Sequence, residues 1–130
     1  MARSQYLIDS NSVIDYLNGK LPPEGNLFIN NVVNDVPQIS VITKIEVLGY
    51  NKLSIEANTI LIDFVKACYI FNLDENVVLQ TIVLRKLHQI KLPDAIIAAT
   101  AIVNDLVLIT RNTKDFSNIS GLKVIDPFSL

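Results

Sequence analysis

The sequence has few of the residues that build covalent cross-links or sulfur-rich sites. Its 130 residues include one cysteine, Cys68, and no tryptophan. A single cysteine excludes an internal disulfide and any metal site made of several thiolates. No apolar run reaches the roughly 18 residues of a membrane span, and the first residues, MARSQYLID, lack the apolar core and cleavage site of a signal peptide. These absences predict an intracellular, cytoplasmic protein.

Charge is also scarce, and neither sign dominates. Charged residues make up 18% of the chain, and the formal net charge is -2. A strongly basic nucleic-acid-binding module is therefore excluded. Hydrophobic residues make up 50%, which is too many for a disordered chain. The length suits one globular domain over residues 1–130, with no visible linker or repeat.

Short apolar segments alternate with segments of helical period. We expect strands at 5–9, 38–42, 106–109 and 122–125, and a further short strand at the end of 54–71. Helices are expected over 12–18, 27–35, 43–50, 54–71, 75–88 and 92–104, with loops at 19–26 and 110–118. The expected helix caps are Ser10 or Asn11, Thr43 in a capping box with Glu46, and Asp74. This alternation predicts an α/β domain with a mainly parallel sheet and helices on both faces.

Four acidic residues are expected at one edge of that sheet. Asp9 ends the first strand, Glu46 lies one helical turn beyond the second, and Asp115 follows the strand at 106–109. Asp94 begins the helix that leads into that strand, so it is expected near the same edge. Ligands bind outside the carboxyl ends of parallel strands. A bound cation stabilises carboxylates that repel one another, and carboxylate oxygens are ligands that Mg²⁺ and Mn²⁺ prefer.

Each of the four acids also has a purely structural interpretation. Asp9 can cap the following helix, Glu46 can serve only the capping box, and Asp94 can favour a helix dipole. Asp115 can be a solvated loop residue. Five further aspartates are expected to be solvated or, in the last case, to lie in a turn: Asp15, Asp35, Asp63, Asp105 and Asp126.

Four segments carry a family resemblance: YLIDSNSVIDYL, SVITKIEVLG, LRKLHQIKLPDAIIAATAI and LVLITRNTKDF. In order and spacing they resemble the motifs of PIN-domain ribonucleases, with the greatest likeness to VapC-type toxins of toxin–antitoxin pairs. The resemblance covers residues 6–128, and the LPDAIIAATA string is its most specific part. Residues 19–37 match less well, and Ser12 stands where the family usually has an apolar residue.

The resemblance implies a three-layer α/β/α fold and a Mg²⁺- or Mn²⁺-dependent endoribonuclease. It places Asp9, Glu46, Asp94 and Asp115 at the family's acidic positions, as catalytic and metal-binding residues. It implies supporting roles for three polar residues, Asn11, Thr110 and Asn112. A homodimer, an RNA substrate (tRNA, ribosomal RNA or mRNA) and a small antitoxin that inserts into the acidic groove are also implied.

Basic residues flank these motifs and offer contacts for RNA phosphates. We select Arg85, Lys91 and Arg111 as RNA-binding candidates; Lys44, Lys86 and Lys114 also flank the site. Ordinary surface charges are the alternative. Two other functions are considered for the whole chain: an inactive PIN-like scaffold, and a receiver domain that accepts phosphate on an aspartate. The receiver pattern needs adjacent acids after the first strand, but Asp9 stands there alone.

Overall fold

The computed structural model describes residues 5–130, and its strands are short and parallel. A three-stranded sheet has the order β1 (Tyr6–Ile8), β4 (Val107–Ile109), β5 (Lys123–Ile125). A second sheet pairs β2 (Gln38–Ser40) with β3 (Tyr69–Phe71). β2 lies beside β1, and the Gln38 side chain donates a 3.1 Å hydrogen bond to the Tyr6 carbonyl. The strands therefore follow one another across the domain as β3, β2, β1, β4 and β5.

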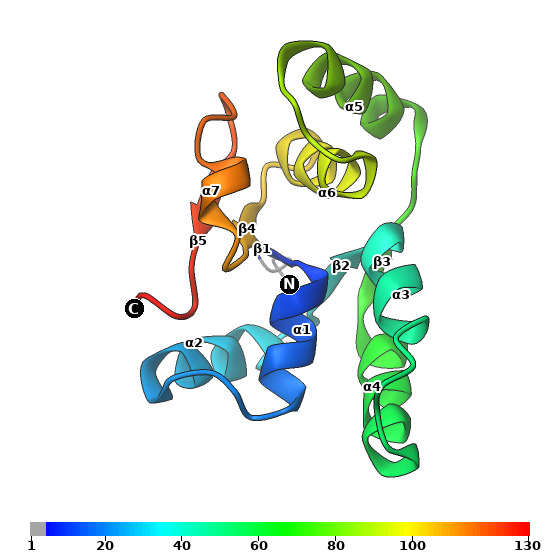
Figure 1. The fold of residues 1–130 in the computed structure, drawn as a ribbon, viewed down its shortest axis with the longest axis vertical. Coiled ribbons are helices and arrows are strands. Elements are labelled where there is room, and N and C mark those ends of the chain that lie inside the picture. The colour runs from blue at the N-terminus through cyan, green and yellow to red at the C-terminus, as the bar shows by residue number, and fades with distance from the viewer. Residues whose placement is uncertain (1–4) are drawn as a thin grey trace.

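Helices cover both sides of these strands, and Figure 1 shows the strands between them. In chain order the helices are α1 (Ser10–Leu17), α2 (Pro23–Asn34), α3 (Val41–Leu48), α4 (Ile55–Ala67), α5 (Glu75–Leu87), α6 (Leu92–Val103) and α7 (Thr113–Phe116). The strands supply two separate cores because neighbouring side chains of a strand point to opposite faces. Leu7 and Leu108 pack with α5, α6 and α7, whereas Ile8 and Ile109 pack with α1, α2, α3 and α4. The expected three-layer α/β/α arrangement is confirmed.

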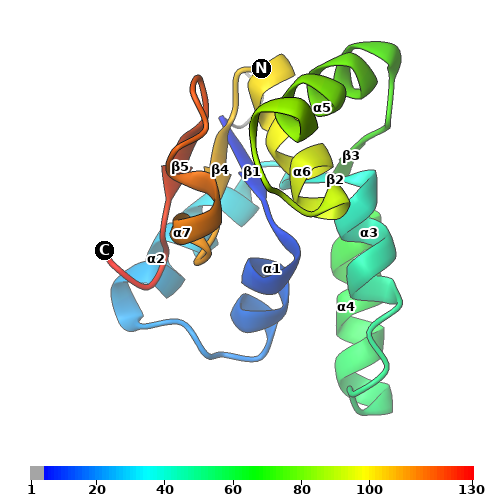
Figure 2. The same ribbon diagram turned by 45° about the horizontal axis from the view of Figure 1, so that its top comes forward.

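The alanine-rich helix α6 is the most deeply packed helix of the domain. Residues 95–101 are all buried, from Ala95 to Ala101. Small side chains allow α5 to approach α6 closely, and these two helices lie against each other (Figures 1 and 2). Asp94 therefore lies in the first turn of a helix that is held firmly on one face of the sheet.

Several expected helix starts are wrong. Asp9, and neither Ser10 nor Asn11, caps α1, and its carboxylate accepts a 2.9 Å hydrogen bond from the Ser12 amide. Ser40 caps α3, so Thr43 lies inside that helix and forms no capping box with Glu46. In each case several nearby polar residues can cap the helix. The residue at which the preceding strand ends determines which of them forms the cap.

Two expected loops contain helix. α2 begins at Pro23, inside the segment assigned to a loop, because proline at the first helical position costs no hydrogen bond. The segment after β4 contains the short helix α7. The other strands and helices lie within a few residues of their expected positions, including the Asp74 cap of α5. Among residues 5–130, no helix has both the length and the hydropathy needed to cross a bilayer.

Candidate active site

Asp9 lies at the junction of β1 and α1, at the carboxyl edge of the sheet. Its amide donates to the Ile109 carbonyl at 3.1 Å, which ties it to β4. Its side chain is buried and receives hydrogen bonds from Ser12 and from the Thr110 side chain. The capping interpretation of Asp9 is thus confirmed, and the same carboxylate also interacts electrostatically with Asp94.

Glu46 reaches this edge from α3. The Ser10 hydroxyl donates a 2.5 Å hydrogen bond to Glu46 Oε1 and lies 3.3 Å from Thr43 Oγ1. This pair links the first turn of α1 to the exposed side of α3. Sequence reasoning did not identify Ser10 as a site residue. The sequence does contain a signal for this role, because Ser10 is the first residue of α1 and directly follows the predicted site residue Asp9.

Asp115 is held by the loop that follows β4. The Thr110 hydroxyl oxygen accepts a 3.0 Å hydrogen bond from the Asn112 amide, and the Asn112 side chain donates to Asp115 Oδ2 at 2.9 Å. Thr110 is fully buried, whereas the Asp115 side chain on α7 is exposed. The predicted supporting residues Thr110 and Asn112 therefore connect Asp9 to Asp115.

Asp94 lies close enough to Asp9, Glu46 and Asp115 for an electrostatic interaction with each of them. Burial raises the pKa of Asp9 above its ordinary value, and Asp94 adds to the rise, while hydrogen bonds from Thr110 and Ser12 oppose it. Burial also raises the pKa of Asp94, and repulsion from Glu46 and Asp115 adds to it, while Lys91 opposes it. The sequence rule that placed all four at one edge is consistent with these interactions.

An open polar cavity of about 350 Å³ lies beside Asp9. Its lining residues are the cap of α1, two residues of α1 and two residues of the loop after β4: Asp9, Asn11, Asp15, Arg111 and Asn112. Glu46, Asp94 and Asp115 are not part of this lining. Asp15 was expected to be solvated, and sequence reasoning missed it. The available signal was its spacing, because Asn11 and Asp15 are four residues apart and share one helix face.

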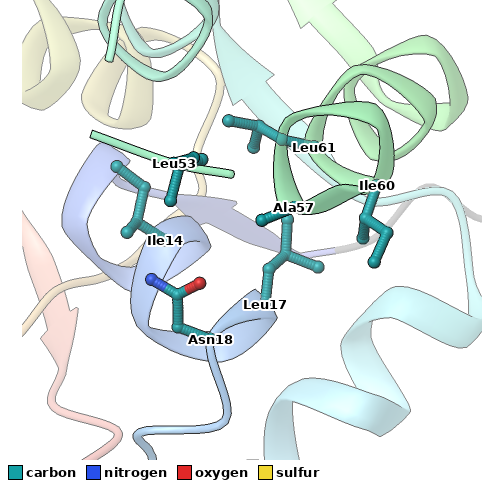
Figure 3. A pocket seen from close by; sticks show the side chains of 7 residues that line it. All are labelled: Ile14, Leu17, Asn18, Leu53, Ala57, Ile60 and Leu61. Atoms are coloured by element: carbon teal, nitrogen blue, oxygen red, sulfur yellow. The ribbon is translucent and has the colours of Figure 1, made fainter. Parts of the chain in front are cut away.

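A second cavity has no comparable chemistry. It measures about 40 Å³ and lies between α1, the residue Leu53 and α4 (Figure 3). Its lining is apolar except for one amide: Ile14, Leu17, Asn18, Leu53, Ala57, Ile60 and Leu61. The candidate site therefore remains the edge of the sheet that carries Asp9, Glu46, Asp94 and Asp115, which we call the acidic edge.

The basic candidates occupy different positions. Arg111 lines the polar cavity, and Lys91 precedes the first residue of α6 and lowers the pKa of Asp94. Arg85 donates a 2.7 Å hydrogen bond to the Ile90 carbonyl, so it braces the connection between α5 and α6. This contact gives Arg85 a structural role in the loop that leads into α6.

The acidic edge has the donor chemistry of a magnesium site, with carboxylate and amide oxygens. Within the part of the chain that the structure describes, no three acidic, histidine or cysteine side chains are grouped tightly enough to hold one ion together. Glu46 is bonded to Ser10, and Asp115 is bonded to Asn112. Mg²⁺ is commonly held by one or two carboxylates and several waters, so a magnesium site does not require a tight group of three such side chains.

Comparisons with known proteins agree with this architecture. A toxin–antitoxin complex from Klebsiella pneumoniae contains a similar chain with 32% identity and a TM-score of 0.76, covering 96% of this chain and 99% of that one. VapBC-1 from nontypeable Haemophilus influenzae gives 26% identity and a TM-score of 0.73, covering 94% and 97%. VapBC2 from Rickettsia felis, bound to a promoter DNA fragment, shares the fold at 22% identity and a TM-score of 0.77, covering 93% and 97%.

The search of curated proteins finds no match. The model of the PIN domain matches residues 6–122, which include all four candidate acids and most of the chain. The fold and the similar solved structures agree with that match. The chain belongs to the PIN domain family.

Proposed function

We propose that this protein is a divalent-metal-dependent endoribonuclease and the toxin of a VapC-type toxin–antitoxin pair. The convergence of Asp9, Glu46, Asp94 and Asp115 carries the proposal, because two of these groups have raised pKa values through burial and mutual repulsion. Such a cluster costs stability unless a cation neutralises it. The similarity to a chain of a toxin–antitoxin complex supports the biological role.

The residues of the acidic edge have different proposed roles in holding a cation. Asp9 and Asp94 are the direct ligands in this proposal, and Glu46 and Asp115 act directly or through water. Thr110 orients Asp9, Ser10 orients Glu46, and Asn112 orients Asp115. A bound Mg²⁺ or Mn²⁺ supplies Lewis-acid activation of water and stabilises charge on the phosphate oxygens. Asn11 and Asp15 extend the polar wall of the cavity beside Asp9.

The chemical step proposed is the attack of water on a phosphorus of the RNA backbone. A carboxylate of the cluster accepts a proton from that water, and a raised pKa makes it a better acceptor near neutral pH. The bond from phosphorus to the 3′ oxygen breaks, and that oxygen leaves with a proton. The products carry a 5′-phosphate and a 3′-hydroxyl, since the ribose 2′-hydroxyl takes no part.

Arg111 and Lys91 are proposed to bind RNA phosphates on two sides of the acidic cluster. Arg111 belongs to the cavity wall, and Lys91 stands at the start of α6. Arg85 is kept as a third candidate because its side chain is exposed, although one of its donors serves Ile90. Contacts to phosphates hold RNA in place without reading its sequence.

The proposed location of the protein is the cytoplasm, where its proposed RNA substrate is found. The proposed partners are a small antitoxin protein and a second copy of this chain. Large apolar side chains are exposed on several helices, including Ile45 on α3 and Leu87 on α5. Exposed apolar surface is typical of proteins that form complexes. The toxin–antitoxin complex from Klebsiella pneumoniae supports the antitoxin proposal by similarity.

RNA cleavage by the purified wild-type protein tests the proposed function. We expect cleavage in Mg²⁺ or Mn²⁺, its loss in EDTA, and its return when the ion is restored. Analysis of the fragment ends should show 5′-phosphates and 3′-hydroxyls. Cleavage that persists in EDTA, or fragments that end in a 2′,3′-cyclic phosphate, would contradict the mechanism.

The inactive scaffold remains the second candidate, and one observation favours it. Among residues 5–130, the acidic side chains do not form a ready group of three metal ligands. Calorimetric titration with Mg²⁺ distinguishes the two functions, because a scaffold needs no specific divalent site. The receiver-domain alternative loses its support once the chain is placed in the PIN domain family.

A further inference from the structure

Arg111 is in contact with an aromatic ring from the far end of the chain. Its guanidinium carbon Cζ lies 3.9 Å from the centroid of the Phe128 ring. Arg111 is exposed and lines the polar cavity with Asp9 and Asn112. A cation above an aromatic face within about 6 Å is attracted by the ring. The ring therefore restrains a basic side chain at the candidate active site.

Phe128 is itself held in place although it is the third residue from the C-terminus. The Asp126 carboxylate accepts hydrogen bonds from the Phe128 amide at 2.8 Å and from the Ser129 hydroxyl at 3.0 Å. The ring packs against the core that lies under α1 and α2. Asp126 was expected in a turn, and this turn sets the position of the ring.

Helix α2 provides a second constraint on the same segment. Gly25 is buried against Pro127, and a Cβ added at residue 25 would come within 1.9 Å of the Pro127 carbonyl oxygen. Only a glycine allows this close approach of the tail to the helix. The segment from Asp126 to Phe128 is thus fixed from two sides.

The contact leaves the hydrogen-bonding capacity of Arg111 available. Within residues 5–130, Arg111 makes this ring contact and no ion pair. The guanidinium carbon lies over the ring. The N–H donors at the edge of the guanidinium are suited to the geometry of a phosphate. A cavity wall that also carries Asp9 and Asp15 needs such a cation if a phosphate is to approach.

We propose that Phe128 is a positioning residue that holds the Arg111 guanidinium ready to bind a backbone phosphate of RNA beside the acidic cluster. This inference rests on the proposed function and adds the C-terminal segment to that site. A long side chain that is ordered before binding loses less entropy when the phosphate arrives. Removing the aromatic face should therefore weaken RNA binding without removing any carboxylate.

The test compares two replacements of the same ring. Phe128→Tyr keeps the aromatic face, and Phe128→Leu keeps an apolar side chain without it. Binding of a fixed oligoribonucleotide is measured by fluorescence anisotropy in EDTA, and KM and kcat are measured in Mg²⁺. We expect Phe128→Leu to raise Kd and KM by about three- to tenfold, with kcat within about twofold, and Phe128→Tyr to stay near the wild type.

A double-mutant cycle with Arg111→Ala separates positioning from general packing. In the Arg111→Ala background, Phe128→Leu should have no further effect on Kd, because the residue that it positions is gone. Equal effects of the Tyr and Leu variants, or a Leu effect that persists without Arg111, would overturn the proposal. Lys66→Ala, at an exposed position of α4, serves as the control for loss of one positive charge.

The binding assay also separates this inference from the proposed function. Binding with the expected dependence on Phe128, but no cleavage in Mg²⁺, would reject the nuclease and keep the positioning role. Cleavage with indistinguishable Tyr and Leu variants would keep the nuclease and reject the positioning role. A wild-type chain that neither binds nor cleaves RNA would overturn both.

Discussion

Asp94→Asn is expected to slow RNA cleavage by at least about 100-fold while making the metal-free protein more stable. Asp94 is half-buried and is repelled by Glu46 and Asp115, so its charge costs folding free energy in the absence of a cation. Asparagine removes that charge and keeps a polar side chain at the start of α6. Water screens part of the repulsion, so the expected gain is modest, about 2–5 °C in Tm.

Asp63→Asn is the matched control for this prediction. Asp63 is exposed on α4 and takes no part in the acidic edge or the polar cavity. Its replacement should leave both the cleavage rate and Tm close to those of the wild type. An Asp94→Asn protein that cleaves RNA at the wild-type rate would remove Asp94 from the proposed mechanism, whatever its stability.

The second large effect is expected on stability as pH and Mg²⁺ are varied. The pKa values of Asp9 and Asp94 are raised in the folded state above the ordinary value of 3.8. Between that value and the folded-state values, the folded chain binds more protons than the unfolded chain. The free energy of unfolding contributed by these groups therefore falls as pH rises through this window and stays low above it.

Mg²⁺ should reverse this loss at neutral pH. A ligand at about 100 times its Kd stabilises the folded state by about 2.7 kcal/mol, which corresponds to about 10 °C in Tm for a domain of this size. Thermal unfolding at several pH values, with EDTA or Mg²⁺, measures both effects. The gain should vanish in Asp94→Asn, and an equal gain in that variant would show that Mg²⁺ acts elsewhere.

The acidic edge was predictable because it follows from topology alone. Once strands are assigned and taken as parallel, residues such as Asp9 and Asp115 fall at the same edge wherever their helices begin. The order of strands and helices also follows from the alternation of apolar segments. These features depend on spacing along the chain, which a single sequence contains in full.

The choice among several possible helix caps, and the contacts between side chains far apart in the sequence, were not predictable. Local rules allow Asp9, Ser10 and Asn11 to cap the same helix, and only the end of β1 selects Asp9. The bond between Ser10 and Glu46 joins residues 36 positions apart. The contact between Arg111 and Phe128 depends on a tail that Gly25 and Asp126 hold in place. No periodic pattern encodes such contacts.

The position of a bound Mn²⁺ ion tests the central claim most directly. Crystals of the wild-type protein grown with Mn²⁺ would give an anomalous signal at the ion. The account predicts a peak beside the carboxylate oxygens of Asp9 and Asp94, with Glu46 and Asp115 bound to it or to its waters. A protein saturated with Mn²⁺ that shows no peak there, or shows its peak at another surface, would contradict the account.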